Sequence, residues 1–477
     1  MTSLIKRGFR GFLSIDQHEV KKVLLLSITF FLLIGAYTVT RELKDAVFST
    51  IVGSDRKLYA YAKLFSMLVL VPAIFFHSRL VDLVRRYKLL YIYSLFYTIV
   101  GLIFVVFLGH PTIGLPNNLN SPDRLLGWFF YFFIEGYAPL VVSVFWAFSN
   151  SITKPGAAKN NYPLMIAASK LGGILWAALA WILLKTAGWN DVKNIQILLT
   201  GSSLLLGLVP LVIHYLIALV PQDEMHGYEA GYQLRKEMKK QHVTENTTLF
   251  QSMFSGLGLL FQYPYVLGIF GMSFFFELVS QALKVENIIF GIATSNNLTQ
   301  FTAFLLWQAL LVHVVAFVVA LFGTRALITF LGERRSILLI PISTGLSVVV
   351  FLLSPSYTSA IFAFVITRSV NYAFAAPLRE SLYIPTVKEI QFKSKAWIDG
   401  FGNKFAKTCA SSFNMSCDGL VGSALLTMQT TFFSCVVLLW CFVAYFLGWR
   451  FERAVKNNEV IGADADMVSA DEPSGKQ

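Results

Sequence analysis

The sequence predicts an all-α polytopic membrane protein with about 12 transmembrane helices. Of its 477 residues, 56% are hydrophobic and only 14% are charged, whereas soluble globular chains carry about 25% charged residues. The apolar residues form blocks of roughly 20, the length that crosses a bilayer as a helix. These observations exclude a soluble enzyme and a disordered protein, and the short alternating segments of a β-barrel are missing.

Twelve apolar blocks are long enough to span a membrane. Their approximate limits are 23–40, 59–78, 89–109, 126–149, 162–184, 196–220, 255–279, 299–322, 336–354, 357–376, 398–425 and 429–448. The longest polar stretch between them divides the blocks into six plus six, a layout typical of carriers that bind substrate between two bundles near the midplane. The predicted parts are an N-terminal arm 1–22, a bundle 23–220, a central loop 221–254, a bundle 255–448 and a tail 449–477.

The basic residues orient the chain. Its net charge is +12, but Lys and Arg gather in alternate loops, which predicts membrane orientation rather than nucleic-acid binding. The pattern places both termini, the central loop and the tail in the cytoplasm. The N-terminal arm is too short and too poor in Ser for a plastid transit peptide, which favours a bacterial inner membrane.

One spacer departs from this pattern. Arg41, Lys44, Arg56 and Lys57 follow the first block, yet the alternation requires this spacer to be external. Either the span count is wrong here, or Arg41 and Lys44 belong to the first span and have a function there.

Charged residues inside the apolar blocks, or at the end of the first block, are the candidates for function, because a charge in hydrocarbon costs several kcal/mol. They are Arg41, Glu42, Lys44, Asp45, Lys63, Glu135, Lys170, Glu277, Arg368, Asp399, Lys404, Lys407 and Asp418. In the block 398–425, polar residues recur at steps of three or four, which predicts one polar stripe that faces protein or water. The stripe comprises Asp399, Asn403, Lys407, Ser411, Asn414 and Asp418.

Two interpretations of these charges stay open. They are ion pairs that join helices, or end residues that reach the membrane surface. Alternatively, they line a water-filled cavity for a polar ligand. Cations slightly outnumber carboxylates in this set, and spare cations suit a polyanion such as a phosphate chain. The carboxylates then accept hydrogen bonds from amino or hydroxyl groups, or carry a proton.

Several motifs are absent from the sequence. There is no G-x-x-x-x-G-K-[ST] loop, so the chain does not hydrolyse ATP by that machinery, and there is no H-E-x-x-H or G-x-S-x-G motif. The seven His and four Cys form no ligand pattern. We therefore expect no enzyme activity, metal or cofactor, and transport driven by gradients or exchange.

Short blocks in a fixed order resemble the nucleotide transporters, or ATP/ADP translocases, of intracellular bacteria and plastids. Arg41-Glu-Leu-Lys-Asp45 is similar to the family's Arg-Asp-x-Lys-Asp, and Phe145-Trp-Ala-Phe-Ser-Asn150 to its Phe-Trp-x-Phe-Ala-Asn. Further matching blocks are Ile152-Thr-Lys154, Arg379-Glu380, Tyr383-Ile-Pro385 and Lys395-Ala-Trp-Ile-Asp399.

The resemblance implies two six-helix bundles similar to the major facilitator architecture, and exchange of ATP for ADP or import of nucleotides with protons. Four charges important for transport in the family match Lys44, Glu135, Glu277 and Lys407. Because they also stand in the charge set, we predict that they bind substrate. The remaining predicted substrate-binding residues are Arg41, Lys170, Arg368, Asp399 and Asn403.

The surroundings of two matched charges differ from the family pattern. Ala406-Lys-Thr-Cys-Ala410 replaces Gly-Lys-Ser-Gly-Gly, and Glu277-Leu-Val-Ser-Gln281 replaces Glu-x-Thr-Trp-Lys. These changes leave open another nucleotide or NAD as substrate, with protons or phosphate as co-substrate. The sequence also leaves open a carrier for a different organic anion, a drug exporter, a membrane enzyme or lipid-handling protein, and a receptor or assembly factor.

Overall fold

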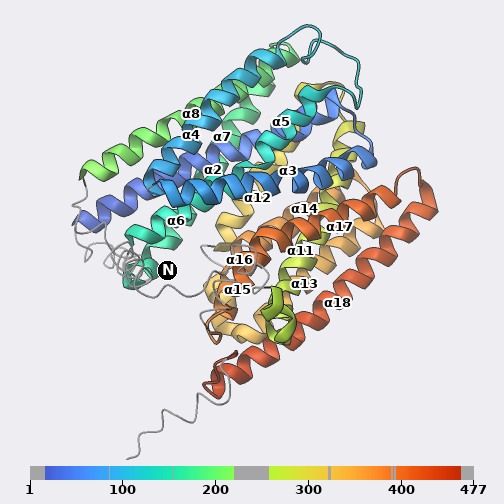
Figure 1. Ribbon diagram of the computed structural model, residues 1–477. Coiled ribbons are helices and arrows are strands. Elements are labelled where there is room, and N and C mark those ends of the chain that lie inside the picture. The colour runs from blue at the N-terminus through green and yellow to red at the C-terminus, as the bar shows by residue number, and fades with distance from the viewer. Residues whose placement is uncertain are drawn as a thin grey trace, which may run out of the picture. The chain divides into compact units, whose positions relative to one another are not determined.

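The computed structural model describes residues 17–84, 86–153, 155–219, 257–320, 324–387, 390 and 394–462 (Figure 1). The helices before the central loop are α2 Gln17–Ile51, α3 Arg56–Leu83, α4 Arg86–Leu108, α5 Leu125–Glu135, α6 Ser143–Ile152, α7 Pro155–Thr186 and α8 Asp191–Leu219. Those after it are α11 Pro264–Ala293, α12 Leu298–Val318, α13 Thr324–Leu353, α14 Tyr357–Val370, α15 Ala376–Leu382, α16 Lys395–Trp397, α17 Asn403–Ser416 and α18 Gly422–Lys456. Three π-helical turns interrupt them: η1 Ala138–Val142, η4 Asn371–Ala375 and η6 Ile398–Gly402.

The predicted all-α membrane fold is confirmed. Helix lies at each of the twelve predicted places, and nine helical segments in the described part of the chain are long and apolar enough to cross a membrane. The blocks 59–78, 357–376 and 398–425 are helical but not among the nine. Polar residues interrupt the last two, including Arg368 in one and the polar stripe in the other.

Several helices run further than the apolar blocks predict, α2 and α11 among them. Helix α2 continues to Ile51, and its last turns are buried at Ala46, Val47 and Phe48. Arg41 and Lys44 therefore belong to the first span, which accounts for two of the four cations of that spacer, while Arg56 and Lys57 follow at the start of α3. Helix α11 likewise ends at Ala293 rather than near residue 279.

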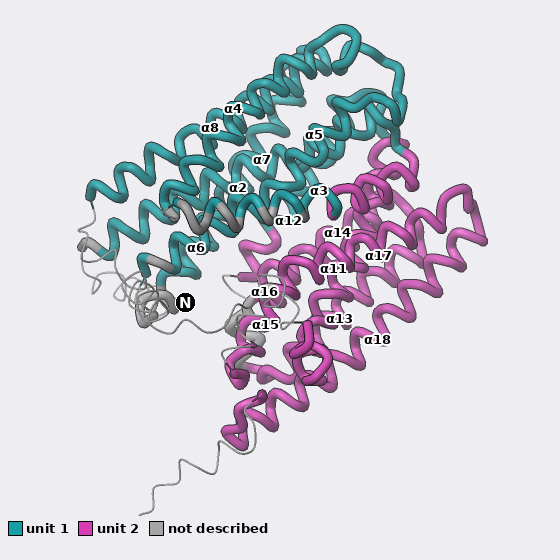
Figure 2. Tube along the Cα trace, viewed as in Figure 1, with its two compact units in different colours: residues 1–54, 68–244, 294–314 teal, residues 55–67, 245–293, 315–477 magenta. Residues whose placement is uncertain are grey.

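The chain forms two compact units (Figure 2). Unit 1 comprises residues 1–54, 68–244 and 294–314, and unit 2 comprises residues 55–67, 245–293 and 315–477. The bundle limits 23–220 and 255–448, which follow the linear sequence, stay predictions. The predicted arm 1–22, loop 221–254 and tail 449–477 lie partly or wholly outside the described residues.

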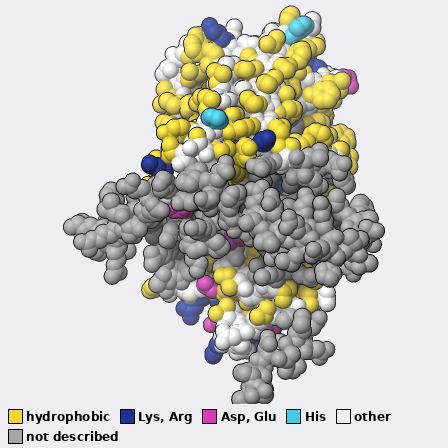
Figure 3. Space-filling model, turned by 60° about the vertical axis from the view of Figure 1, so that its left-hand side comes forward, with side chains coloured by type: hydrophobic (Ala, Val, Ile, Leu, Met, Phe, Trp, Pro, Cys, Tyr) yellow, Lys and Arg dark blue, Asp and Glu magenta, His cyan; other side chains and the backbone are white. Residues whose placement is uncertain are grey.

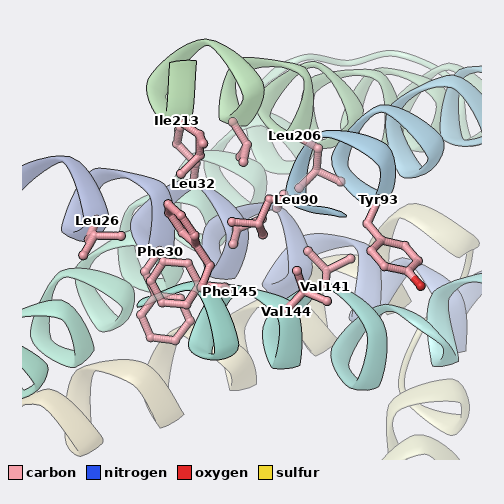
Figure 4. Packing of buried hydrophobic residues seen from close by; sticks show 14 of the residues in the cluster. Leu26, Phe30, Leu32, Leu90, Tyr93, Val141, Val144, Phe145, Leu206 and Ile213 are labelled. Carbon is pink, nitrogen blue, oxygen red and sulfur yellow. The ribbon is translucent and has the colours of Figure 1, made fainter. Parts of the chain in front are cut away.

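The core of unit 1 joins α2, α4, α6 and α8 (Figure 4). Phe30 and Phe145 stack with ring centroids 4.5 Å apart. Gly172 brings α7 close to α2, because a Cβ there would lie 2.3 Å from the carbonyl oxygen of Phe31. Lipid tails are as apolar as leucine, so such close packing rather than transfer from water stabilises the helix contacts.

Large apolar side chains cover much of the exterior. Among the described residues on the face in Figure 3, hydrophobic side chains predominate over scattered Lys and Arg. On α18, Leu438 is 69% exposed and Phe442 is 70% exposed. Apolar surface on this scale suits contact with lipid.

Candidate functional site

A buried ion pair in unit 1 joins two of the predicted site residues. Lys44 on α2 donates to Glu135 at the end of α5, with 2.7 Å between Nζ and Oε2. Asp45 Oδ1 lies 3.5 Å from the same nitrogen. The Lys44 side chain is 3% exposed and Glu135 is 12% exposed. The cation is therefore held among carboxylates away from solvent, where an isolated charge would be costly.

Local structure around Glu135 shapes this pair. Tyr131 lies one turn earlier on α5, and its ring centroid is 4.4 Å from the Lys44 nitrogen. After Glu135 the helix changes to the π-helical turn η1, which contains Pro139. A π-helical turn rotates the residues on either side relative to a regular helix and is frequent at functional sites.

The face of α2 that carries Lys44 also carries Arg41 and Tyr37. Arg41 pairs with its neighbour Glu42 at 2.6 Å, and its guanidinium lies 5.9 Å from the Tyr37 ring centroid. Tyr37 stacks on the buried Tyr137 at 5.0 Å. The structure thus brings Arg41 onto the same half-buried polar face as Lys44.

A second pair in unit 2 joins the other two matched charges. Lys407 on α17 lies 3.5 Å from Glu277 on α11, measured between Nζ and Oε2. The side chains are 26% and 17% exposed, so this pair is more accessible to solvent than the pair in unit 1. Glu277 lies in the middle of α11, well inside the membrane-spanning segment Pro264–Ala293.

The polar stripe of residues 398–425 is only partly continuous. Asn403 and Lys407 are half-buried on α17, and Ser411 and Asn414 are buried. Asp399 lies on η6 and is exposed. The Ser411 hydroxyl and both polar side-chain atoms of Asn414 have no hydrogen-bond partner among the described residues. Buried polar atoms of this kind normally have a partner.

The remaining predicted residues lie in two places. Lys170 is half-buried on α7 in unit 1. Arg368 is half-buried on α14 in unit 2, where it donates to the Tyr372 hydroxyl at 3.1 Å and lies 5.3 Å from the Phe364 ring centroid.

A further ion-pair cluster in unit 2 escaped the sequence analysis. Arg56 at the start of α3 makes a two-pronged pair with Glu286 on α11, and its Nη2–Oε2 distance is 3.0 Å. Lys57 lies 3.1 Å from Asp418. The sequence signal was the excess of cations in a spacer predicted to be external. Their carboxylate partners were hidden, because Glu286 was assigned to a spacer and Asp418 to the stripe.

A histidine in unit 1 was also missed. His313 on α12 is buried, and its Nε2 lies 3.1 Å from the Thr38 hydroxyl on α2. A Cβ at Gly173 on α7 would lie 2.7 Å from the His313 ring. This contact joins three helices of unit 1 at one polar point.

No group of three or more His, Cys, Asp or Glu side chains suited to a metal ion occurs in the part of the chain that the structure describes. The two matched pairs offer the chemistry of lysines and glutamates. Each lysine can donate three charge-assisted hydrogen bonds, and each glutamate can accept hydrogen bonds or a proton.

Comparisons with known proteins decide the family. A model of the TLC ATP/ADP transporter family matches residues 4–120 and 127–451. The chain belongs to this family. TLC family membership makes it a transporter and not an enzyme, and all four matched charges lie inside the aligned residues.

Relatives of known name agree with the TLC assignment. The chain is 23% identical to ADP,ATP carrier protein 1 of Chlamydia pneumoniae, over 97% of this chain and 98% of that protein. It is 30% identical to a plastidic ATP/ADP-transporter of Solanum tuberosum, over 32% of this chain but only 27% of the potato protein.

Solved structures support the fold. The inward open conformation of the xylose transporter XylE from E. coli has a TM-score of 0.60 at 12% identity, over 90% of this chain and 95% of that one. At this identity the likeness concerns the fold alone, and it confirms the predicted major-facilitator-like architecture.

Proposed function

We propose that this TLC transporter carries nucleotides across the membrane by alternating access, with exchange of ATP for ADP as the reaction. The observation that carries the proposal is the occurrence of Lys–Glu pairs at the four family-matched positions, Lys44 with Glu135 in a buried pair and Lys407 with Glu277 in a partly buried one. The names of the relatives support ATP and ADP as the substrates.

The pairs suggest how phosphate binding proceeds. Phosphate oxygens compete with Glu135 for Lys44 and with Glu277 for Lys407, because each lysine gains charge-assisted hydrogen bonds to a more highly charged partner. A displaced glutamate then accepts a hydrogen bond from the ribose or base, or it takes up a proton. The unpartnered atoms of Ser411 and Asn414, on the helix that carries Lys407, supply further polar contacts.

The substrates' charges set the electrical cost of exchange. Exchanging ATP⁴⁻ for ADP³⁻ moves one net charge, about 2.3 kcal/mol per 100 mV of membrane potential. The membrane potential therefore biases the direction of exchange unless a proton or phosphate moves as well.

Proton-coupled nucleotide import is the second candidate. The observation that favours it is that each lysine has a glutamate within ion-pair distance, because such a carboxylate can compensate the lysine's charge while the carrier returns empty. A glutamate displaced by phosphate can carry the proton. Vesicles loaded with nucleotide take up label faster than empty vesicles if exchange operates, and a pH gradient drives uptake into empty vesicles if import operates.

The nucleotide site is tested by uptake into proteoliposomes. A panel of labelled ATP, ADP, other nucleotides and NAD is offered to the wild-type protein, to Lys407→Ala and to Lys185→Ala, whose lysine is exposed at the end of α7. Removing a charged hydrogen-bond donor costs about 1.5–3 kcal/mol, so we expect uptake by Lys407→Ala to fall about 10- to 100-fold. The Lys185→Ala control retains uptake.

Three results contradict this proposal. Full nucleotide uptake by Lys407→Ala overturns the site. Uptake of a lipophilic cation or another organic anion, with no nucleotide transported or competing, overturns the substrate. A protein that transports nothing in the panel points to a receptor or assembly role.

We also propose the bacterial inner membrane as location, with both termini in the cytoplasm. The alternation of basic loops supports this orientation. Fusion of alkaline phosphatase after Gln477 is expected to give an inactive enzyme, and an active fusion contradicts the orientation.

A further inference from the structure

A cavity of about 770 Å³ lies in unit 2 between α13 and the C-terminal part of α18. Its polar lining consists of Glu333, Arg334, Arg335, Tyr445, Glu452 and Lys456. None of these residues belongs to the Lys407–Glu277 pair or to the polar stripe. The cavity is therefore separate from the nucleotide site proposed above.

Two glycines shape the cavity. Gly332 has φ 74° and ψ 166°, values that break α13 and that side chains rarely adopt. Gly448 brings α18 close to α13, because a Cβ there would lie 3.1 Å from both the backbone oxygen and the Cγ of Arg334. The helices thus touch at Gly448 and Arg334, and the break in α13 at Gly332 lies two residues from that contact.

The lining carries an excess of positive charge. Three cations, Arg334, Arg335 and Lys456, accompany the two carboxylates Glu333 and Glu452. Arg334 pairs with Glu452 at 3.1 Å. Arg335 and Lys456 have no ion-pair partner among the described residues and are both exposed. Two accessible cations on one concave surface favour an anionic ligand.

The surroundings of the cavity are those of a membrane interface. On α18, Phe442 is 70% exposed, Tyr445 is 54% exposed and Trp449 is 41% exposed. The Arg334 guanidinium lies 5.3 Å from the Tyr445 ring centroid, and that of Arg453 lies 5.7 Å from the Trp449 ring. Exposed Tyr and Trp beside basic residues mark the level of lipid headgroups. This end of α18 leads into the tail that the basic loops assign to the cytoplasm.

We propose that this cavity binds the phosphate headgroup of an anionic phospholipid. Arg335 and Lys456 donate to the phosphodiester oxygens, and the acyl chains follow the apolar face of α18 beside Leu438 and Phe442. Basic pockets at the cytoplasmic membrane surface bind anionic headgroups in this way. A soluble phosphate would use the same cations but would gain nothing from the apolar face, which favours the lipid.

Lipid binding to the full-length protein tests the proposal. The wild-type protein in phosphatidylcholine nanodiscs, with or without phosphatidylglycerol, is analysed by native mass spectrometry and thermal unfolding. We expect phosphatidylglycerol to be retained in preference to phosphatidylcholine and to raise Tm. In Arg335→Gln/Lys456→Gln, the preference falls about 10- to 30-fold, as expected for the loss of two basic contacts to a lipid surface.

A matched control removes two cations elsewhere. Lys185→Gln/Lys193→Gln changes two exposed lysines of unit 1. The Lys193 nitrogen lies 5.2 Å from the ring centroid of Trp189, so this control also removes a cation beside an interfacial aromatic ring. This control is expected to retain the preference for phosphatidylglycerol. Because Arg335 and Lys456 are exposed, the test variant is expected to fold like the wild-type protein.

Two outcomes overturn the proposal. One is an unchanged preference for phosphatidylglycerol in Arg335→Gln/Lys456→Gln. The other is displacement of the retained lipid, or an equal rise in Tm, by inorganic phosphate added to the wild-type protein, which would assign the cavity to a soluble anion. This second arm needs no variant, and none of the readouts depends on nucleotide transport.

Discussion

The paired lysines of the two units differ in how far they are buried. In unit 1, Lys44 lies 2.7 Å from Glu135 and 3.5 Å from Asp45, and its side chain is 3% exposed. In unit 2, Lys407 lies 3.5 Å from Glu277 and is 26% exposed. The first lysine has two nearby carboxylates and an aromatic ring at 4.4 Å, and the second has one ion-pair partner among the described residues.

This difference in burial suggests different roles for the two lysines, one in the stability of the protein and the other in binding the ligand. A charge withdrawn from water depends on its partners, so breaking the unit 1 pair leaves buried carboxylates without their nearest cation. Breaking a pair that water already reaches lowers the stability of the protein less, because water solvates the group that remains. We infer that Lys44 contributes more to folding, and that Lys407 is the more readily available to an incoming phosphate.

The largest expected effect is on stability. Lys44→Met is expected to lower the free energy of unfolding by about 3–5 kcal/mol, the cost typical of removing one partner from a buried pair. Lys407→Met is expected to cost less than about 1 kcal/mol. Thermal unfolding in detergent measures both variants. Equal losses would contradict the contrast between the two units.

The next effect concerns ligand binding. Lys407→Gln is expected to weaken the stabilisation of the protein by ADP about 10- to 100-fold in apparent Kd, because one charged donor to phosphate is lost. Lys404→Gln, one turn earlier on α17, is the matched control and is expected to bind ADP normally. If the control loses as much affinity, the general charge of α17 rather than Lys407 binds the phosphate.

Double-mutant cycles sharpen the comparison. We expect a coupling energy above about 2 kcal/mol for Lys44 with Glu135, and below about 1 kcal/mol for Lys407 with Glu277. The cycle uses Met for each lysine and Gln for each glutamate, with unfolding measured in one detergent. A larger coupling in unit 2 would reverse our assignment of roles.

The smallest loss of stability is expected for a partly exposed ion pair near the C-terminal end of α18, which serves as a reference for the two Lys–Glu pairs. Arg450 donates to Glu459, with 2.7 Å between Nη1 and Oε2, and this hydrogen bond lowers the pKa of the Glu459 carboxyl. Because the folded pKa is the lower one, the pair stabilises the protein above the ordinary glutamate pKa of about 4.3, and the contribution is lost as pH falls through the folded value.

Glu459→Gln measures this reference. We expect a loss of less than about 1 kcal/mol at neutral pH, because the carboxylate is partly exposed. The difference in Tm between wild-type and variant should be constant above about pH 5 and disappear in more acidic solution. A difference that grows with acidity would show that the pKa shift has the opposite sign.

The membrane fold was predictable because hydropathy is a property of each segment by itself. Helix α2 shows what hydropathy alone does not predict. Its apolar block ends near residue 40, but the helix continues to Ile51, because Lys44 has a partner on α5 in Glu135 and itself lies 3.5 Å from Asp45, which makes their burial tolerable. A hydropathy profile ends the predicted span before charged residues such as Lys44, because it takes no account of their partners.

The candidate site was predictable as a set of residues but not as a set of contacts. Lys44, Glu135, Glu277 and Lys407 stood out because charges are rare in apolar blocks. The slight excess of cations in the whole charge set did not indicate that Lys44 and Lys407 each pair with a glutamate. Likewise, the excess cations Arg56 and Lys57 were visible in the sequence, but their pairs with Glu286 and Asp418 were not.

The sequence by itself determined that this chain enters a bilayer as helices and which charged side chains enter with it. Tertiary structure alone decided the partner of each charge, since Lys44 and Glu135 are 91 residues apart. Such a contact depends on the rotation and depth of two helices, and π-helical turns such as η1 alter both. A shift of a few ångströms in the rotation or depth of a helix decides whether an ion pair is withdrawn from water or remains accessible to it.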